Sequence, residues 1–203
     1  MSTIIKDGAG SGFSARVDHK NRLQIAGETN PAFETASQEG RGYFINTGVA
    51  TLTNDSESCL VYFQNLDDDR ELFVESVRIS LSGSTGGTGS VLLQNYINPT
   101  GGTIITGTNG VDFFEVPPVN NNLAELNSQP FNGISRIGLN GTTVSGPNLP
   151  LPDLAETASS VMPLVNVALP KGTATAVTIT PPAGNTLMQV VIAISLYYLN
   201  GAN

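Results

Sequence analysis

The sequence predicts an all-β protein, a jelly-roll-like antiparallel β-sandwich of about eight or nine strands that follows an extended N-terminal arm. Short apolar segments recur along the chain between clusters of Gly, Pro, Asn and Asp, as they do in proteins built of short strands. Patterns typical of helices are scarce, and no repeat of fixed period suggests a propeller or a solenoid. The 203 residues, of which 39% are hydrophobic, suit one domain of average size.

Residues 1–42 are predicted to form the extended arm. The segment is rich in glycine, and its apolar residues occur singly or in pairs among charged residues, so no stretch sustains the period of a helix or a strand. Isolated apolar side chains on an extended arm can fill pockets on another chain. A disordered terminus is the alternative interpretation. The expected anchoring residues are Ile4, Ile5, Phe13, Val17, Leu23 and Ile25.

The sandwich body is predicted to begin with three strands. Residues 43–53 and 59–64 are apolar segments separated by a short polar turn, which predicts a hairpin. Residues 71–81 alternate between apolar and polar side chains, but the alternation changes phase between Val74 and Val77. A change of phase within a strand indicates a β-bulge.

The middle of the body, which spans residues 43–203, is predicted to contain short strands and one long irregular segment. The strands are expected at residues 91–97, 103–106 and 111–116. Residues 117–160 contain repeated prolines and three consecutive asparagines. This composition predicts a long excursion with at most one helical turn, near residues 123–126 or 154–159.

The last three strands are the most clearly marked, because turns rich in Pro and Gly separate them. They are expected at residues 161–169, 173–180 and 186–199. In the last strand, one set of alternating positions is entirely apolar: Met188, Val190, Ile192, Ile194, Leu196 and Tyr198. The opposite set is half apolar, and a strand covered on both faces is either central in a sandwich or part of a subunit contact. The expected self-association residues are Val191, Ala193, Tyr197 and Leu199.

Charge and cysteine content argue against several classes of function. The formal net charge is -8, and only 9 residues are Lys or Arg, whereas binding to nucleic-acid phosphates needs clustered basic residues. The start of the chain lacks the pattern of a signal peptide, and no apolar run reaches the ~18 residues of a membrane span. The single cysteine, Cys59, allows no internal disulfide. Neither nucleic acid nor a membrane is therefore an expected partner.

The sequence predicts no catalytic, cofactor-binding or metal-binding residues, so the protein is expected not to be an enzyme. The one histidine, His19, lies in the glycine-rich arm, and Cys59 opens an apolar strand, where thiols are usually buried and unreactive. The glycine-rich residues 83–89 are not followed by the Lys and helix of a phosphate-binding loop. The acidic residues 67–69 are interpreted as a turn, with a calcium site as the alternative.

Several segments resemble a family of virion-associated structural proteins of tailed bacteriophages. These segments are IIKDGAGSGFSARVDHKNRLQI at residues 4–25, YFINTGVATLT at 43–53, SCLVYFQN at 58–65, INPTGGTII at 97–105 and LPKGTATAVTITPPAGNTLMQVVIAI at 169–194. The resemblance is weakest over residues 117–160. It implies a non-enzymatic capsid decoration, or cement, protein with a jelly-roll-like body.

The resemblance also implies partners and a location. The expected partners are the major capsid protein, bound on the outer face of the shell through the arm, and further copies of the chain in a homotrimer. The expected location is the capsid surface of the virion, after synthesis in the host cytoplasm. Two alternatives stay open. One is a receptor- or glycan-binding module of a phage tail or fibre that uses residues 117–160 for recognition, and the other is a β-sandwich hydrolase.

Overall fold

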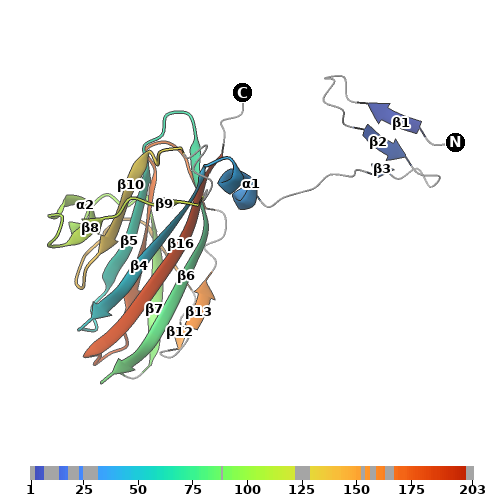
Figure 1. The fold of residues 1–203 in the computed structure, drawn as a ribbon. Coiled ribbons are helices and arrows are strands. Elements are labelled where there is room, and N and C mark those ends of the chain that lie inside the picture. The colour runs from blue at the N-terminus through green and yellow to red at the C-terminus, as the bar shows by residue number, and fades with distance from the viewer. Residues whose placement is uncertain are drawn as a thin grey trace. The chain divides into compact units, whose positions relative to one another are not determined.

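A computed structural model describes residues 3–6, 14–17, 23–24, 32–87, 89–121, 129–151, 154–155, 159–162 and 167–199. The chain divides into two compact units, residues 1–31 and residues 32–203. Figure 1 shows the elements of each unit. Residues 32–42, predicted to be part of the arm, belong to the second unit, where they form helix α1 (Ala32–Gln38) and lead into the first strand of the body.

The first unit contains a small antiparallel sheet of three strands. The strands are β1 (Thr3–Lys6), β2 (Ser14–Val17) and β3 (Leu23–Gln24). Four of the expected anchoring residues lie in these strands: Ile4, Ile5, Val17 and Leu23. The other two, Phe13 and Ile25, lie outside the described residues.

The second unit is a sandwich of two antiparallel sheets, so the predicted all-β sandwich is confirmed (Figure 1). The seven-stranded sheet contains, in spatial order, β11 (Asn148–Pro150), β7 (Ser90–Ile97), β15 (Ala174–Thr180), β5 (Ser58–Asn65), β10 (Gly133–Gly138) and β8 (Phe113–Glu115), with β12 (Leu154–Ala155) also paired to β7. The six-stranded sheet contains β13 (Ser159–Met162), β6 (Glu71–Thr85), β16 (Leu187–Leu199), β4 (Gly42–Leu52) and β9 (Val119–Asn120), with β14 (Val167–Leu169) also paired to β6.

Consecutive long strands of the body lie in different sheets. The chain alternates between the layers from β4 through β5 and β6 to β7, and again from β14 through β15 to β16. The hairpin expected from residues 43–53 and 59–64 is therefore wrong, because β4 pairs with β16 and β9, whereas β5 pairs with β15 and β10. A short polar connection looks the same in sequence whether it turns within a sheet or crosses to the facing sheet.

The main core lies between the two sheets, and β16 lies at the centre of the six-stranded one. The apolar set predicted for the last strand, Met188 to Tyr198 at alternate positions, is at most 1% exposed. The predicted bulge is also confirmed. Val74 lies opposite Leu196 and Ser76 lies opposite Ser195, which leaves Glu75 as the extra residue on β6.

The strand expected at residues 103–106 is instead one helical turn, α2 (Thr103–Thr106). Its β-branched composition favours a strand, but glycines bound it on both sides, and Gly102 has φ 104, which side chains rarely adopt. The Ile104 N–H donates to the Thr143 carbonyl at 3.1 Å, which ties the turn to the body. Tertiary contacts therefore override the local preference for a strand.

The excursion at residues 117–160 contains more strand than expected. β10 lies inside the seven-stranded sheet between β5 and β8, and β9 extends the six-stranded sheet. β10 lacked a sequence signal because its buried face includes Ser135 and its outer face includes Arg136, so apolar and polar residues do not alternate. The helical turn suggested near residues 154–159 is wrong at residues 154–155, which form β12, and residues 123–126 lie outside the described residues.

Candidate functional site

The outer face of the seven-stranded sheet is covered by the chain itself. Ile104 of α2 and Phe113 of β8 pack against outward-facing side chains of β5, β7 and β15. The residues of this second core are Cys59, Tyr62, Tyr96, Ile104, Phe113, Ala174 and Ala176. All of them are buried, so this part of the face is an internal contact.

Arg136 holds the covering segment in place. Its guanidinium lies 4.3 Å from the centroid of the Phe113 ring, and Nη1 donates to the carbonyls of Ile104 and Ile105 at 2.9 Å each. Nη2 lies 3.2 Å from Oε1 of Glu115. The Arg136 side chain thus donates hydrogen bonds to carbonyls of α2, covers the aromatic ring of Phe113 and pairs with the carboxylate of Glu115, both of which belong to β8.

The thiol of Cys59 lies under this covering segment. It is 0% exposed, and burial raises its pKa to about 12. The thiol is therefore protonated at neutral pH and lacks the thiolate character that a nucleophile needs. This agrees with its interpretation as an unreactive, buried cysteine.

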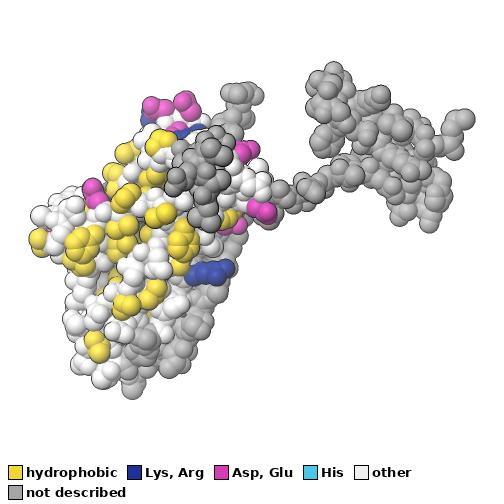
Figure 2. Space-filling model, in the orientation of Figure 1, with side chains coloured by type: hydrophobic (Ala, Val, Ile, Leu, Met, Phe, Trp, Pro, Cys, Tyr) yellow, Lys and Arg dark blue, Asp and Glu magenta, His cyan; other side chains and the backbone are white. Residues whose placement is uncertain are grey.

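The outer face of the six-stranded sheet contrasts with the covered one. We call its exposed and half-buried central part the open face. The open face comprises Phe44, Asn46, Val49 and Thr51 of β4, Val191, Ala193 and Ser195 of β16, and Ser76, Arg78 and Ser80 of β6. The ladder aligns them in rows, for example Val49 beside Val191 beside Ser80. Figure 2 shows hydrophobic side chains distributed over this face of the sandwich.

The open face is poor in charge. Arg78 is its one charged residue, whereas residues 32–203 together carry 5 basic and 14 acidic residues, a formal net charge of -9 (5 minus 14). Two of its apolar side chains are exposed, Val49 at 63% and Phe44 at 39%, and Val119 of the neighbouring β9 is 71% exposed. Among the described residues, this face thus combines exposed apolar side chains with no acidic group on an otherwise acidic body, which is typical of an interaction surface.

The open face also has a hollow. Its volume is about 150 Å³, and Val49, Ser80, Leu81, Gln189 and Val191 line it. The lining comes from all three long strands of the sheet, β4, β16 and β6. The hollow is large enough for one apolar side chain.

The expected self-association residues divide into two groups. Val191 and Ala193 lie on the open face and are half-buried. Tyr197 is an internal contact, because its ring stacks on Phe73 at 5.3 Å between centroids and meets Phe33 of α1 edge to face at 6.2 Å. Leu199 is 37% exposed at the end of β16.

Sequence reasoning missed the residues that β4 contributes to the open face. Phe44 and Val49 lie on the same outer side as Val191, but Gly48 and a register shift separate them. This irregularity hides the period-two pattern that would have placed both residues on one face. The usable signal was Gly48, which interrupts the segment predicted to form this strand.

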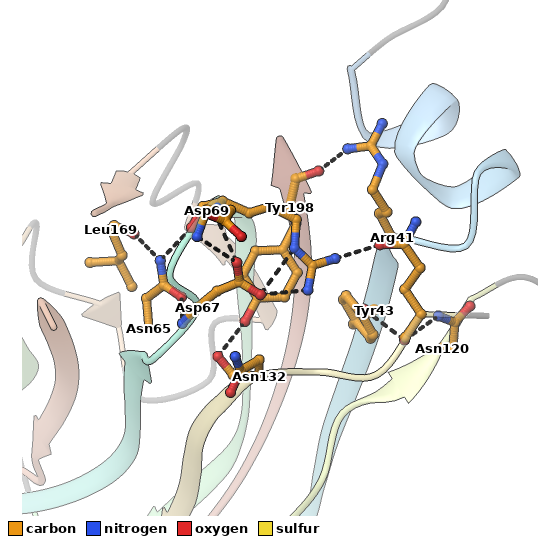
Figure 3. Close-up of polar contacts among 11 residues, drawn as sticks. Arg41, Tyr43, Asn65, Asp67, Asp69, Asn120, Asn132, Leu169 and Tyr198 are labelled. Carbon is orange, nitrogen blue, oxygen red and sulfur yellow. Dashed lines mark hydrogen bonds and ion pairs between the residues drawn. The ribbon is translucent and has the colours of Figure 1, made fainter. Parts of the chain in front are cut away.

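A polar cluster joins four parts of the body at the end of the sandwich next to α1 (Figure 3). Its centre is the pair of Arg70 and Asp67, in which Nε and Nη2 of the arginine lie 3.0 and 2.5 Å from Oδ2 of the aspartate. The guanidinium lies 4.3 Å from the centroid of the Tyr198 ring. The Tyr198 hydroxyl donates to the Asn132 carbonyl at 2.7 Å. The cluster thus connects the turn after β5 with the excursion and the last strand.

Arg41 adds the beginning of the body to this cluster. Its side chain is 6% exposed and donates to the Tyr198 carbonyl and to Glu39. In return, the Tyr198 N–H donates to the Arg41 carbonyl at 3.0 Å. Residues 39–41 are therefore a structural part of the body.

The acidic residues 67–69 form a turn. Oδ1 of Asp67 accepts hydrogen bonds from the N–H groups of Asp69 and Arg70 at 3.1 and 2.9 Å, and Oδ2 is bound by Arg70. The hydrogen bond from the Arg70 side chain is the main reason why the pKa of Asp67 is lowered. Within the described part of the chain, no three His, Cys, Asp or Glu side chains are grouped so that they could hold a metal ion.

A second hollow lies beside the excursion. Its volume is about 300 Å³, and its lining includes Val116, Pro117, Pro118 and Phe131. Ser135 also lines it, and the Ser135 hydroxyl is buried without a hydrogen-bond partner among the described groups. Glu115 lines it as well, so the hollow combines apolar walls with a carboxylate and one unused hydroxyl, as small ligand sites do.

The histidine His19 lies outside the described residues. None of the described helices is long and apolar enough to cross a membrane.

The sequence was compared with models of known protein families and with curated proteins. Neither comparison finds a match.

Proposed function

We propose that the protein is a non-enzymatic structural protein of a phage virion, a capsid decoration or cement protein that binds the outer face of the shell. One observation carries the proposal: a compact body, whose exposed sheet face has no acidic side chain among its described central residues, follows a separate small unit whose three strands hold four of the six expected anchoring residues. Such a chain suits adhesion to a larger assembly. In this proposal residues 1–31 bind the major capsid protein, and the body associates with further copies, as a homotrimer.

The strand order of the body supports the jelly-roll interpretation. Consecutive strands alternate between the two sheets at both ends of the sequence, as they do in sandwiches built from Greek keys. The resemblance to virion-associated proteins implies the same architecture. In closed symmetry one contact is repeated in each copy, so several weak attachments to a shell act together.

Removal of the first unit tests the proposal. A variant that lacks residues 2–31 retains α1 and Arg41, so it is expected to fold and to self-associate but not to sediment with purified shells. The full chain is expected to sediment with them. The matched full-length variant Ile4→Asp/Ile5→Asp is expected to lose shell binding too, because both residues are proposed anchors. Full occupancy of shells by the shortened variant would contradict the proposal.

The second hollow favours one alternative, a receptor- or glycan-binding module of the tail or fibre. Most of its lining belongs to residues 117–160, the segment proposed for recognition in that alternative. Copy number separates the two functions. Quantitative mass spectrometry of particles is expected to find hundreds of copies per particle for a decoration protein, whereas a dozen or so indicates the tail.

A further inference from the structure

We propose that the open face is the self-association surface, and that the Phe44 ring of one copy occupies the hollow lined by Val49, Ser80 and Val191 on the next copy. The inference rests on the proposed function for its biological purpose, since decoration proteins act as assemblies. Its physical basis is independent of the shell. Charge and shape favour a second copy as the occupant of the face.

Charge restricts where two bodies can meet. Each body has a formal net charge of -9, so two copies repel each other wherever acidic side chains face one another. The turn at residues 67–69, Asp112 and Glu115 make other parts of the body acidic. The open face has Arg78 as its one charged residue, and Glu75 lies at the bulge on its border. Two copies can therefore approach through the described central residues of this face without opposing carboxylates.

The size of the sheet limits the area of the contact. The three long neighbouring strands β4, β16 and β6, spaced ~4.8 Å apart at ~3.3 Å per residue, outline a face of about 14 by 40 Å. The part next to α1 is covered by the contact between Phe33 and Tyr197. The remainder is smaller than the ~800 Å² per partner of a standard interface, so we expect a contact that depends on concentration.

The open face presents both a projecting side chain and a hollow. Phe44 projects at the end nearer α1, where it lies opposite Val119 of β9 in the ladder, and both side chains are exposed. The hollow lies further along the strands, around Val191. A cavity of ~150 Å³ can hold a benzene-sized ring. Because the ring and the hollow lie at different places on the chain's surface, each copy can present its ring to one neighbour and its hollow to another, as a homotrimer requires.

The test is the mass of the full chain in solution, without shells, measured by sedimentation equilibrium. The wild type is expected to be oligomeric at about 10 μM. Phe44→Ala is expected to raise the dissociation constant at least about tenfold, and Val191→Asp at least about a hundredfold, because a buried carboxylate would be unpaired. The matched control Leu92→Asp changes an apolar residue that is 45% exposed on the other sheet and should leave the mass unchanged. Thermal unfolding verifies that each variant is folded.

A cysteine pair tests the position of the ring. Phe44 and Ser80 lie on strands that flank β16, so within one chain they are ~10 Å apart or more, beyond the ~7 Å limit for a disulfide. The double variant Phe44→Cys/Ser80→Cys is therefore expected to form disulfides between chains on oxidation, at a concentration raised at least about tenfold to offset the loss of the Phe44 ring. Each single variant serves as a control, since Cys59 is buried.

Several results would overturn the inference. They are a monomeric wild type, an equal effect of Leu92→Asp, failure of the cysteine pair to link two chains, and a Val191→Asp variant that still self-associates but no longer binds shells. The last result would assign the open face to the shell. Self-association through the open face without any shell binding would support the inference and reject the proposed decoration function, so the two failures can be told apart.

Discussion

The two outer faces of the sandwich have similar strand patterns but different surroundings. On the seven-stranded sheet, Ile104 and Phe113 from the chain's own α2 and β8 cover the outer apolar residues and bury them. On the six-stranded sheet, Val49 and Phe44 remain exposed. A half-apolar outer pattern therefore indicates a contact, but not whether the contact lies within one chain or between chains. The difference comes from the segment between β7 and β10.

The accessibility of Cys59 tests whether one face is permanently covered. Its thiol is buried and its pKa is raised to about 12, so a thiol reagent at pH 8 should modify it at least about a thousandfold more slowly than it modifies the unfolded chain. The measurement is the labelling rate with and without denaturant. Rapid labelling of the native protein would mean that α2 and β8 leave the face readily.

Phe113→Ala tests how much the covering segment contributes to stability. The ring is 3% exposed and lies under Arg136, so its removal should lower the free energy of unfolding by about 3–5 kcal/mol. Urea denaturation measures the change. The neighbouring Phe114, which is 49% exposed, is the matched control, and Phe114→Ala should change the value by less than about 1 kcal/mol. Equal effects would remove the distinction between covered and exposed positions.

Asp67→Asn tests the polar cluster, which lies at the end of the sandwich and belongs to neither outer face. It removes the partner of Arg70, and loss of one partner from a largely buried pair should cost about 3 kcal/mol. Because the folded-state pKa of Asp67 is lowered, the pair stabilises the protein above the unfolded value of about 3.9, and this contribution is lost as the pH falls through the folded pKa.

Urea denaturation between pH 7 and pH 2 measures this effect. The variant should lack the part of the acid destabilisation that belongs to Asp67. Asp68→Asn is the matched control, since Asp68 is exposed and pairs with the exposed Lys171, and its stability should stay near that of the wild type. If the free energy of unfolding of Asp67→Asn depended on pH in the same way as that of the wild type, the role assigned to the pair would be contradicted.

Val49→Thr should have the smallest effect on folding. The side chain is 63% exposed on the open face, so the free energy of unfolding of the isolated, dissociated chain should change by less than about 0.5 kcal/mol. Measurement at protein concentrations below the dissociation constant separates folding from association. A loss of several kcal/mol would mean that Val49 packs within its own chain, and that the open face is not open.

Predictions were correct for strands in which apolar and polar residues alternate and whose ends are marked by clear turns. The buried set of β16 and the bulge beside Val74 were both predicted in this way. The pairing of β4 and β5 was not, because a connection between sheets resembles a hairpin turn. On the open face, Val191 was identified from the alternation of β16, whereas Phe44 was missed because the irregularity at Gly48 interrupts the pattern of β4.

A density map of intact particles tests the central claim most directly, namely that this chain adheres to its neighbours through the sheet face it leaves uncovered. The account predicts copies of the sandwich at regularly repeated positions on the shell. In each copy, density from a neighbouring copy should cover β4, β16 and β6, and the segment of α2 and β8 should be free of such contact. Copies found solely in the tail, or β4, β16 and β6 facing solvent in every copy, would contradict it.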